Sequence, residues 1–342
     1  MKKILAFMGT VLTLITLVSC KPKEEAKAAD TKAPANAKKV AIVYSTGGKG
    51  DKSFNDSAYR GLQMAKDKLG IEFSEYEPKD PSAEAQNQLF QYAEKGEYEL
   101  IIGVGFTMKD AVVAAAKAFP DQKFALVDDE ISDLPNVVSL LFKEQEGSFL
   151  LGAMSAMVTK TNTLGFVGGV EAPVIWRFQA GFEQGAKYVN PNIKILPVFI
   201  NGNNPFNDPQ TAKTLTETLI GKNADIVFQV AGASGSGVFQ AAKEKGVYAL
   251  GVDSNQDGEE PGVILTSMVK RVDNAVFNQI KDTLDGNFKS GIKYFGLKED
   301  GVGTTDFEFS KKVVTEEIRN KIKEIAEKIK SGEIKVSDKV QK

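Results

Sequence analysis

From Lys39 onward, short apolar runs alternate with stretches in which apolar residues recur every three or four positions. The runs 40–44 and 100–104 are typical of buried strands. Between them lie apolar residues that share one face of a predicted helix, namely Ala58, Leu62, Ala65 and Leu69. Alternation of strands and helices is typical of βαβ units. The pattern therefore predicts an α/β fold with largely parallel sheets.

The pattern of the first half recurs in the second half. Without gaps, at an offset of 126 residues, segment 99–117 aligns with segment 225–243, and five positions are identical. Segments 124–129 and 248–253 follow in the same order and also resemble each other. This recurrence predicts two similar α/β lobes. Chance similarity is the alternative, because Ala and Val are common in any amphipathic βα unit.

Two such lobes indicate a binding cleft. Ligands of open α/β sheets lie beyond the carboxyl ends of the strands, so two Rossmann-like lobes that face each other enclose a cleft lined by their loops. A hinge between the lobes then closes the cleft around a ligand. We assign residues 39–140 and about 272–305 to the N-terminal lobe. The C-terminal lobe takes about 141–271 and 306–342.

The N-terminus has the features of an export signal. Two lysines precede the apolar run 4–18, which as a helix reaches roughly 22 Å and falls short of a hydrocarbon core of about 30 Å. Residues 1–19 are therefore predicted to be a signal peptide. The run ends in Leu17-Val18-Ser19-Cys20, which resembles a bacterial lipobox. Cys20 is the predicted lipidation site, and an ordinary signal peptide with a chance Cys is the alternative.

Residues 20–38 are predicted to be the lipidated Cys and a flexible tether. Positions 21–38 contain no Val, Ile, Leu, Met or aromatic residue, so they bury too little surface to offset the entropy of ordering. Several acyl chains on Cys20 would make a stable anchor in a lipid membrane. The expected location is the bacterial cell envelope, with the folded body outside the cytoplasm.

Composition narrows the functional class. The 342 residues include no His and one Cys. This excludes Ser-His and Cys-His nucleophiles, His-ligated metals and an intramolecular disulfide. Asp, Glu, Lys and Tyr still permit catalysis, but a binding protein without metal or other cofactor is favoured over an enzyme. After loss of 1–19 the net charge is near −4, so no basic surface for nucleic acid is expected.

The first predicted loop, 45–55, is rich in glycine but fits neither nucleotide-binding motif. A P-loop needs Gly-Lys-Ser/Thr after four spacer residues, and a dinucleotide motif needs a third glycine where Ser53 stands. The glycines instead permit a tight loop that presents Phe54 to a planar ligand and Asn55 to a ring edge. Alternatively, Ser53 caps the following helix and Phe54 packs on its own lobe.

Charged residues stand at the ends of three predicted strands. Asp128 and Asp253 suit vicinal hydroxyls, because one carboxylate accepts two hydrogen bonds, and capping of a helix is an equal alternative. Lys270 is either a ligand donor or a solvated cation, with the second favoured.

Aromatic and glycine residues in other loops add candidates. Phe206 lies in Asn-Pro-Phe-Asn-Asp-Pro, a run of turn formers in which a contact residue is more natural than a buried anchor. Trp176 and Phe178 compete with it, although core packing is favoured for both. Gly232 permits backbone N–H groups to approach a ligand at a helix start.

Five segments together carry a family resemblance: Gly-Gly-x-x-Asp-Lys-Ser-Phe-Asn, Asn-Pro-Phe-Asn-Asp-Pro, Ala-Gly-Ala-Ser-Gly-Ser-Gly, Gly-Val-Asp-Ser-Asn-Gln and Thr-Ser-Met-Val-Lys-Arg-Val-Asp. They resemble the basic membrane protein family of purine-nucleoside-binding lipoproteins, from about Lys39 to Lys311. The resemblance implies the type I periplasmic binding protein fold. It also implies a substrate-binding protein of an ABC importer, with a permease and an ATPase as partners.

The resemblance further implies roles for single residues. Phe54 would stack on the base together with Phe206 or, in reserve, Phe178. Asn55 would help to recognise the base. The ribose and its surroundings would be held by Asp128, Gly232, Asp253 and Lys270. One departure is Ser45, where family members often carry Asp.

The sequence therefore predicts a membrane-tethered, monomeric receptor for adenosine, guanosine or inosine. A receptor for a sugar or another small solute on the same fold is the alternative in the same class. Two alternatives come from other classes: an envelope lipoprotein that acts through macromolecular contacts, and a nucleoside-cleaving enzyme.

Overall fold

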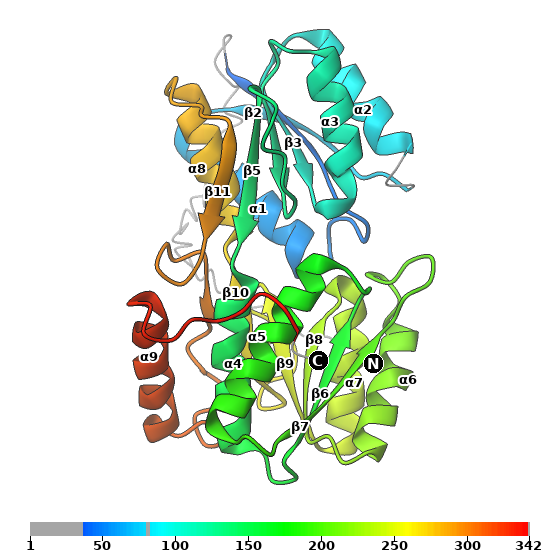
Figure 1. Ribbon diagram of the computed structural model, residues 1–342. Coiled ribbons are helices and arrows are strands. Elements are labelled where there is room, and N and C mark those ends of the chain that lie inside the picture. Colours follow the sequence, from blue (N-terminus) through cyan, green and yellow to red (C-terminus); the bar gives the residue numbers. More distant parts are fainter. Residues whose placement is uncertain (1–36, 80–82, 341–342) are drawn as a thin grey trace, which may run out of the picture.

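Two six-stranded sheets form the body of the protein, and helices cover both faces of each (Figure 1). The computed structural model describes residues 37–79 and 83–340. The first sheet has the order β11-β5-β4-β3-β1-β2, with β1 (Lys39–Val43), β2 (Glu72–Tyr76), β3 (Tyr98–Val104), β4 (Phe124–Val127), β5 (Val137–Phe142) and β11 (Gly291–Phe295). The second has the order β12-β10-β9-β8-β6-β7, with β6 (Thr163–Gly168), β7 (Lys194–Phe199), β8 (Ile226–Val230), β9 (Tyr248–Asp253), β10 (Ile264–Lys270) and β12 (Val302–Thr304).

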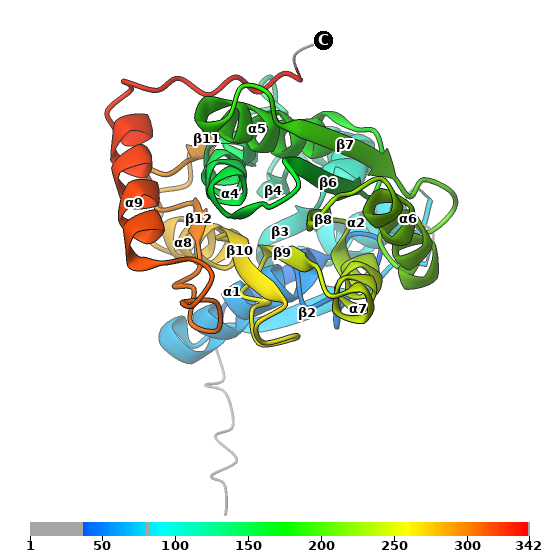
Figure 2. The same cartoon turned by 90° about the horizontal axis from the view of Figure 1, so that it is seen from below.

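Among the described residues, eight helices lie between strands along the chain: α1 (Phe54–Leu69), α2 (Ala83–Lys95), α3 (Lys109–Ala118), α4 (Glu144–Val158), α5 (Pro173–Val189), α6 (Pro209–Gly221), α7 (Gly235–Lys245) and α8 (Val272–Leu284). A further helix, α9 (Glu316–Lys330), follows β12. Short 3₁₀ turns, η1 (Phe106–Met108) and η2 (Gly232–Ser234), precede α3 and α7. Viewed from below, α4 and α5 lie on one side of strands β6 to β10, and α6 and α7 on the other (Figure 2). The α/β fold with largely parallel sheets is confirmed.

Some expectations from the sequence concern the N-terminus. The signal peptide expected at 1–19, the lipidation site Cys20 and the tether up to residue 36 lie outside the described residues. Within the described part of the chain, no helix has the length and apolar character needed to cross a membrane.

Strand pairing assigns the elements to two lobes. All pairs of the first sheet are parallel, and we call this sheet with α1–α3 and α8 the first lobe. The second lobe comprises the second sheet with α4–α7 and α9. Its one antiparallel pair joins β12 to β10. Residues 302–304 therefore belong to the second sheet, whereas the sequence analysis placed them in the N-terminal lobe.

The internal repeat corresponds to equivalent pieces of the two lobes. Segment 99–117 forms β3, η1 and α3, and segment 225–243 forms β8, η2 and most of α7. Each strand lies between its neighbours in the same order, β4-β3-β1 in one sheet and β9-β8-β6 in the other. The 126-residue offset thus aligns structurally equivalent elements.

Glycines permit the closest helix contacts in both lobes. A Cβ at Gly61 of α1 would lie 2.6 Å from the backbone oxygen of Asp273 on α8. A Cβ at Gly181 of α5 would lie 2.1 Å from the backbone oxygen of Gln145 on α4. Because these neighbours are backbone atoms, no rotamer change makes room. Glycines therefore allow α1 to pack closely on α8, and α5 on α4.

Three segments cross between the lobes side by side. They lie between β5 and α4, between β10 and α8, and between β11 and β12. The amide of Lys143 donates to Phe295 O at 3.0 Å, and that of Arg271 donates to Gly301 O at 2.8 Å. These bonds connect the crossings, so the hinge is a small hydrogen-bonded unit and not three independent strands.

The close contact at Gly181 makes a prediction about stability. The change Gly181→Ala forces α5 away from α4 and should lower the free energy of unfolding by about 2–3 kcal/mol. Chemical denaturation of both proteins measures the change. Gly221→Ala is the matched control, because a Cβ at this exposed end of α6 meets no atom within 4 Å. Equal stabilities for Gly181→Ala and the parent protein would contradict the prediction.

Candidate functional site

A cleft lies between the lobes at the carboxyl ends of the parallel strands. It contains about 540 Å³ of empty space, counting the part open to solvent. Its lining residues are Ser45, Thr46, Asp51, Phe54, Asn55, Gly105, Phe106, Asp128, Val174, Ile175, Phe178, Phe206, Val230, Ala231, Gly232, Asp253 and Lys270. Both lobes therefore contribute to the cavity.

All eight candidate binding residues from the sequence line this cavity: Phe54, Asn55, Asp128, Phe178, Phe206, Gly232, Asp253 and Lys270. Their roles toward a ligand stay predictions. The 126-residue repeat aligns Phe106 with Gly232, and both stand in 3₁₀ turns at the cavity. Phe106 belongs to no motif in the sequence, and only its alignment with Gly232 in the repeat points to it.

Asp51 organises the loop between β1 and α1. Its carboxylate accepts the backbone N–H groups of Ser53 and Asn55 at 2.8 Å and of Asp56 at 3.1 Å. These are donors at the start of α1, which otherwise lack partners. Ser53 occupies the N-cap position but makes no side-chain capping bond. Capping by Ser53, one alternative in the sequence analysis, is therefore replaced by capping from Asp51.

The Asn55 side chain is bonded mainly within its own loop. Its Oδ1 accepts the Ser45 N–H at 3.0 Å, and its Nδ2 donates to Asp51 at 3.1 Å. The side chain is almost completely buried. An amide nitrogen carries two hydrogens, so one N–H is left for a ligand, while the oxygen already has a donor.

Half-buried phenylalanines from opposite lobes approach the cavity. Phe54 begins α1 in the first lobe. Phe206 belongs to the loop before α6, and this loop is held by Ser234, whose Oγ donates to Pro205 O at 2.8 Å and whose N–H donates to Phe206 O at 3.3 Å. Gly169 makes room for the Phe206 ring, since a Cβ there would lie 2.4 Å from a ring carbon.

Phe178 has a different environment from Phe54 and Phe206. It is 2% exposed, and its ring centroid lies 6.5 Å from that of Phe228 in the core of the second lobe. Phe178 therefore forms part of the cavity wall and is less available for stacking than Phe206.

A buried charge cluster lies where the lobes meet. Lys270 Nζ is 2.7 Å from both carboxylate oxygens of Asp128 and 2.9 Å from Glu144 Oε1. Arg177 Nε donates to the other oxygen of Glu144 at 2.6 Å. The Lys270 ammonium also lies 5.1 Å from the ring centroid of Phe54. Two cations thus face two carboxylates in a largely buried site.

Burial and charge compete in setting the ionisation of this cluster. Burial by itself lowers the pKa of Lys270, but the carboxylates of Asp128 and Glu144 outweigh it and hold that pKa above its usual value. Burial raises the pKa of Glu144 when taken alone, but the charges of Lys270 and Arg177 bring it below the usual range. Burial raises the pKa of Asp128 despite the opposing charge of Lys270.

One oxygen of the cluster lacks a hydrogen bond. Asp128 Oδ2 accepts from Lys270, whereas Oδ1 is buried and close to the ammonium but has no donor in bonding geometry. The charge of the ammonium 2.7 Å away compensates this oxygen, which still has a lone pair for a hydrogen bond. Because Asp128 lines the cavity, a hydroxyl of a ligand is a suitable donor.

Asp128 and Asp253 occupy equivalent positions in the two lobes. Both lie at the carboxyl end of the fourth strand, and both have positive φ, 76° and 63°. This backbone is uncommon for residues other than glycine and is concentrated at functional sites. Ser53 Oγ of the first lobe donates to Asp253 Oδ2 at 2.5 Å. Burial raises the pKa of Asp253 to about 7.

Other contacts join the lobes at the rim of the cavity. Ser254 Oγ donates to Ser53 O at 2.8 Å, and Gln256 Nε2 donates to Lys52 O at 3.2 Å. Arg60 on α1 donates to Ser254 Oγ at 2.9 Å. The rim is therefore closed by hydrogen bonds between a loop of the first lobe and the residues after β9.

Glu144 and Arg177 were missed by the sequence analysis. Glu144 is the first residue of α4, where an acidic residue is ordinary, and Arg177 lies between Trp176 and Phe178 on α5. No local pattern distinguishes them, so only the fold relates them to Lys270. In the described part of the chain, no group of three or more His, Cys, Asp or Glu could hold a metal ion.

Comparisons with known proteins identify the family of the chain. The family model described as "ABC transporter substrate-binding protein PnrA-like" matches residues 37–340. An uncharacterized lipoprotein of Pyrococcus abyssi is 35% identical, over 89% of this chain and 85% of that protein. The ABC transporter nucleoside-binding protein BmpA of Lactococcus lactis is 33% identical, over 99% of each chain.

A solved structure is similar over nearly the whole described body. It is an ABC transporter solute-binding protein from Aeropyrum pernix K1, with a TM-score of 0.81 and 30% sequence identity. The match covers 87% of this chain and 92% of that chain. The similarity therefore extends over both lobes and the cleft between them.

The raised pKa of Asp253 predicts a pH-dependent stability. Between pH 4 and 7 the unfolded chain releases the Asp253 proton while the folded protein retains it, so Asp253 destabilises the fold increasingly as the pH rises. Relative to Asp253→Asn, which cannot titrate, the parent protein should lose up to about 4 kcal/mol over this range. Chemical denaturation of both proteins from pH 4 to 8 measures the difference. A difference independent of pH would contradict the prediction.

Proposed function

Because the chain belongs to the family of PnrA-like substrate-binding proteins of ABC transporters, we propose that it is a lipid-anchored receptor that encloses a purine nucleoside between its lobes. The family consists of substrate-binding proteins and not of enzymes, so a nucleoside-cleaving activity is set aside. Its partners are an ABC permease and ATPase, to which the receptor delivers the ligand.

The observation that carries the proposal is the pairing of aromatic and carboxylate groups in one cavity. Phe54 and Phe206 come from opposite lobes and are both half buried, which suits stacking of a planar base. Asp128 and Asp253 approach the same cavity from opposite lobes beside Lys270. Carboxylates suit vicinal hydroxyls such as those of a ribose. A nucleoside combines both ligand features.

The binding strength expected of such a site fits a receptor. Base stacking on an aromatic residue contributes about 1–3 kcal/mol, and a hydrogen bond to a charged group about 1.5–3 kcal/mol. After the cost of association these contributions reach the roughly −8 kcal/mol of a micromolar complex. The name of the Lactococcus lactis relative, a nucleoside-binding protein, supports the same ligand class.

The base end of the cavity offers few free groups. Asn55 retains one N–H, and Ser45 contributes a hydroxyl. We therefore include adenosine, guanosine and inosine as candidates, since no group in this part of the cavity favours one of them strongly.

Titration calorimetry tests the function and the role of Phe54 together. The parent protein should bind at least one of adenosine, guanosine and inosine, and free ribose should bind far more weakly. Phe54→Ala removes one stacking surface and should weaken binding more than about tenfold. Phe309→Ala is the matched control, because Phe309 is 44% exposed and does not line the cavity.

Each contrary outcome of the titration has a defined meaning. No heat with any nucleoside would overturn the proposed ligand class. Binding of free ribose as tightly as of a nucleoside would favour a sugar receptor on the same fold. An unchanged Kd for Phe54→Ala, with the fold intact by circular dichroism, would remove Phe54 from the binding surface.

We also propose that Cys20 carries the lipid anchor. Its place after Leu17-Val18-Ser19 and the naming of several relatives as lipoproteins support this. In bacterial cells, Cys20→Ser should abolish incorporation of labelled palmitate and release the protein from the membrane fraction. Retention of label in the variant would contradict the proposal.

A further inference from the structure

The loop between β1 and α1 needs support from outside itself. Gly47, Gly48, Gly50 and Lys52 all have positive φ, between 52° and 100°. Glycine adopts such angles without strain, but it has many other accessible conformations, so a glycine-rich loop loses much conformational entropy when it is ordered. The same loop nevertheless supplies residues of the cavity wall and leads directly into Phe54. Its shape must therefore be imposed by contacts on both sides.

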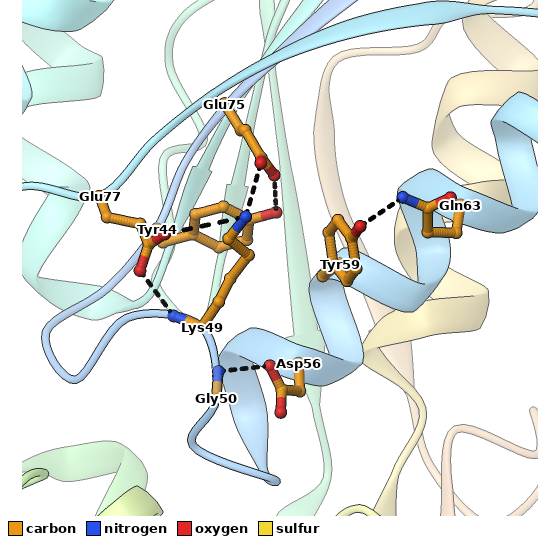
Figure 3. Close-up of polar contacts among 8 residues, drawn as sticks. All are labelled: Tyr44, Lys49, Gly50, Asp56, Tyr59, Gln63, Glu75 and Glu77. Atoms are coloured by element: carbon orange, nitrogen blue, oxygen red, sulfur yellow. Dashed lines mark hydrogen bonds and ion pairs between the residues drawn. The ribbon is translucent and has the colours of Figure 1, made fainter.

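Lys49 holds the outer side of the loop (Figure 3). Its backbone N–H donates to Glu77 Oε2 at 2.8 Å, and its Nζ donates to Glu75 Oε1 at 2.5 Å. The ammonium lies 4.9 Å from the ring centroid of Tyr59 and 5.8 Å from that of Tyr44. Tyr44 in turn donates its hydroxyl to Glu75 Oε2 at 3.1 Å. Lys49 thus has two carboxylate partners and two aromatic neighbours.

These partners belong to the rigid part of the first lobe. Glu75 lies on β2, the edge strand of the sheet, and Glu77 follows it. Tyr44 follows β1 and is completely buried. The hydrogen bond to Glu75 raises the pKa of Lys49 above its usual value, so the cation persists at any physiological pH. The loop is therefore fastened to the sheet edge by a charge that does not titrate away.

The loop also packs directly on Glu77. A Cβ at Gly48 would lie 2.4 Å from Glu77 Oε2. At the inner side, Asp56 accepts the N–H groups of Gly50 at 2.7 Å and Lys52 at 2.9 Å. Neither Lys49 nor its carboxylate partners line the cavity. This cluster therefore acts on the loop and does not contact a ligand.

We propose that Lys49 is a positioning residue: it clamps the loop to β2 and thereby presets Asp51 and Phe54 for the ligand. The inference rests on the proposed nucleoside-binding function. A preset loop loses less conformational freedom when a ligand binds, so release of the clamp weakens binding although no ligand contact is removed.

Affinity measurements test the clamp through a double-mutant cycle. Lys49→Met keeps the apolar stem between the tyrosines and removes the charge, and it should weaken nucleoside binding about tenfold. Glu75→Gln should have a similar effect, and the double variant should bind no more weakly than Lys49→Met, since both remove the same interaction. Additive losses would overturn the clamp.

Lys95→Met is the matched control. The Nζ of Lys95 lies 5.7 Å from the ring centroid of Tyr92, so it too is a lysine next to a tyrosine ring. Lys95 ends α2, and helix ends of this kind lie at the pole of the lobe away from the strand carboxyl ends. Its replacement should leave the affinity unchanged.

Hydrogen exchange tests the clamp without any ligand. In Lys49→Met the amides of residues 49, 50 and 52 should exchange faster, while exchange in β1 and β3 stays slow. Unchanged exchange in the loop overturns the proposal, as does faster exchange with unchanged affinity. If the parent protein binds no nucleoside while loop exchange still accelerates, the clamp stands and the proposed function fails. Glu75→Gln gives the same readout should Lys49→Met be globally destabilised.

Discussion

Lys270 places a positive charge between the two lobes with its side chain only 1% exposed. A buried cation is costly unless carboxylates surround it. Its partners come from separate elements, since Asp128 follows β4 in the first sheet and Glu144 begins α4 beyond the hinge. Loss of either partner leaves an uncompensated charge. The relative position of the sheets, and with it the width of the cavity, therefore depends on this cluster.

Asp128 and Asp253, which stand at the ends of equivalent strands, differ in their contact with Lys270. Asp128 is in direct contact with Lys270 and keeps one oxygen without a donor. Asp253 is held by the Ser53 hydroxyl. Burial raises the pKa of both carboxyls, to about 7 for Asp253. Near neutral pH, Asp253 therefore exists in both an acceptor form and a donor form.

Features of the fold and the cavity could be predicted where a short stretch of sequence determines them. Alternating apolar runs mark strands, and residues directly after them, such as Asp128 and Asp253, must meet at the carboxyl edge of a parallel sheet. The three-residue strand β12 has no such pattern, and its assignment to the N-terminal lobe was wrong. Glu144 and Arg177 lie near the starts of α4 and α5, where charged residues are common. Only the folded structure brings Glu144 into contact with Lys270 and Arg177. The capping of α1 by Asp51 instead of Ser53 likewise depends on how the glycines fold the loop.

Besides the buried contacts of Lys270 with Asp128 and of Ser53 with Asp253, the contacts between the lobes fall into two groups with different consequences. The crossings are joined by backbone bonds, such as Lys143 N–H to Phe295 O, and these are compatible with rotation about the hinge. The rim is joined by a few polar contacts, including Ser254 to Ser53 and Gln256 to Lys52. A typical hydrogen bond contributes only about 0.5–1.5 kcal/mol net. For a ligand to enter a cavity that both lobes line, the rim hydrogen bonds must open, while the backbone bonds of the crossings can persist. Opening also separates Lys270 from Asp128 and Ser53 from Asp253, so a ligand decides between open and closed states only by the difference in its affinity for the two.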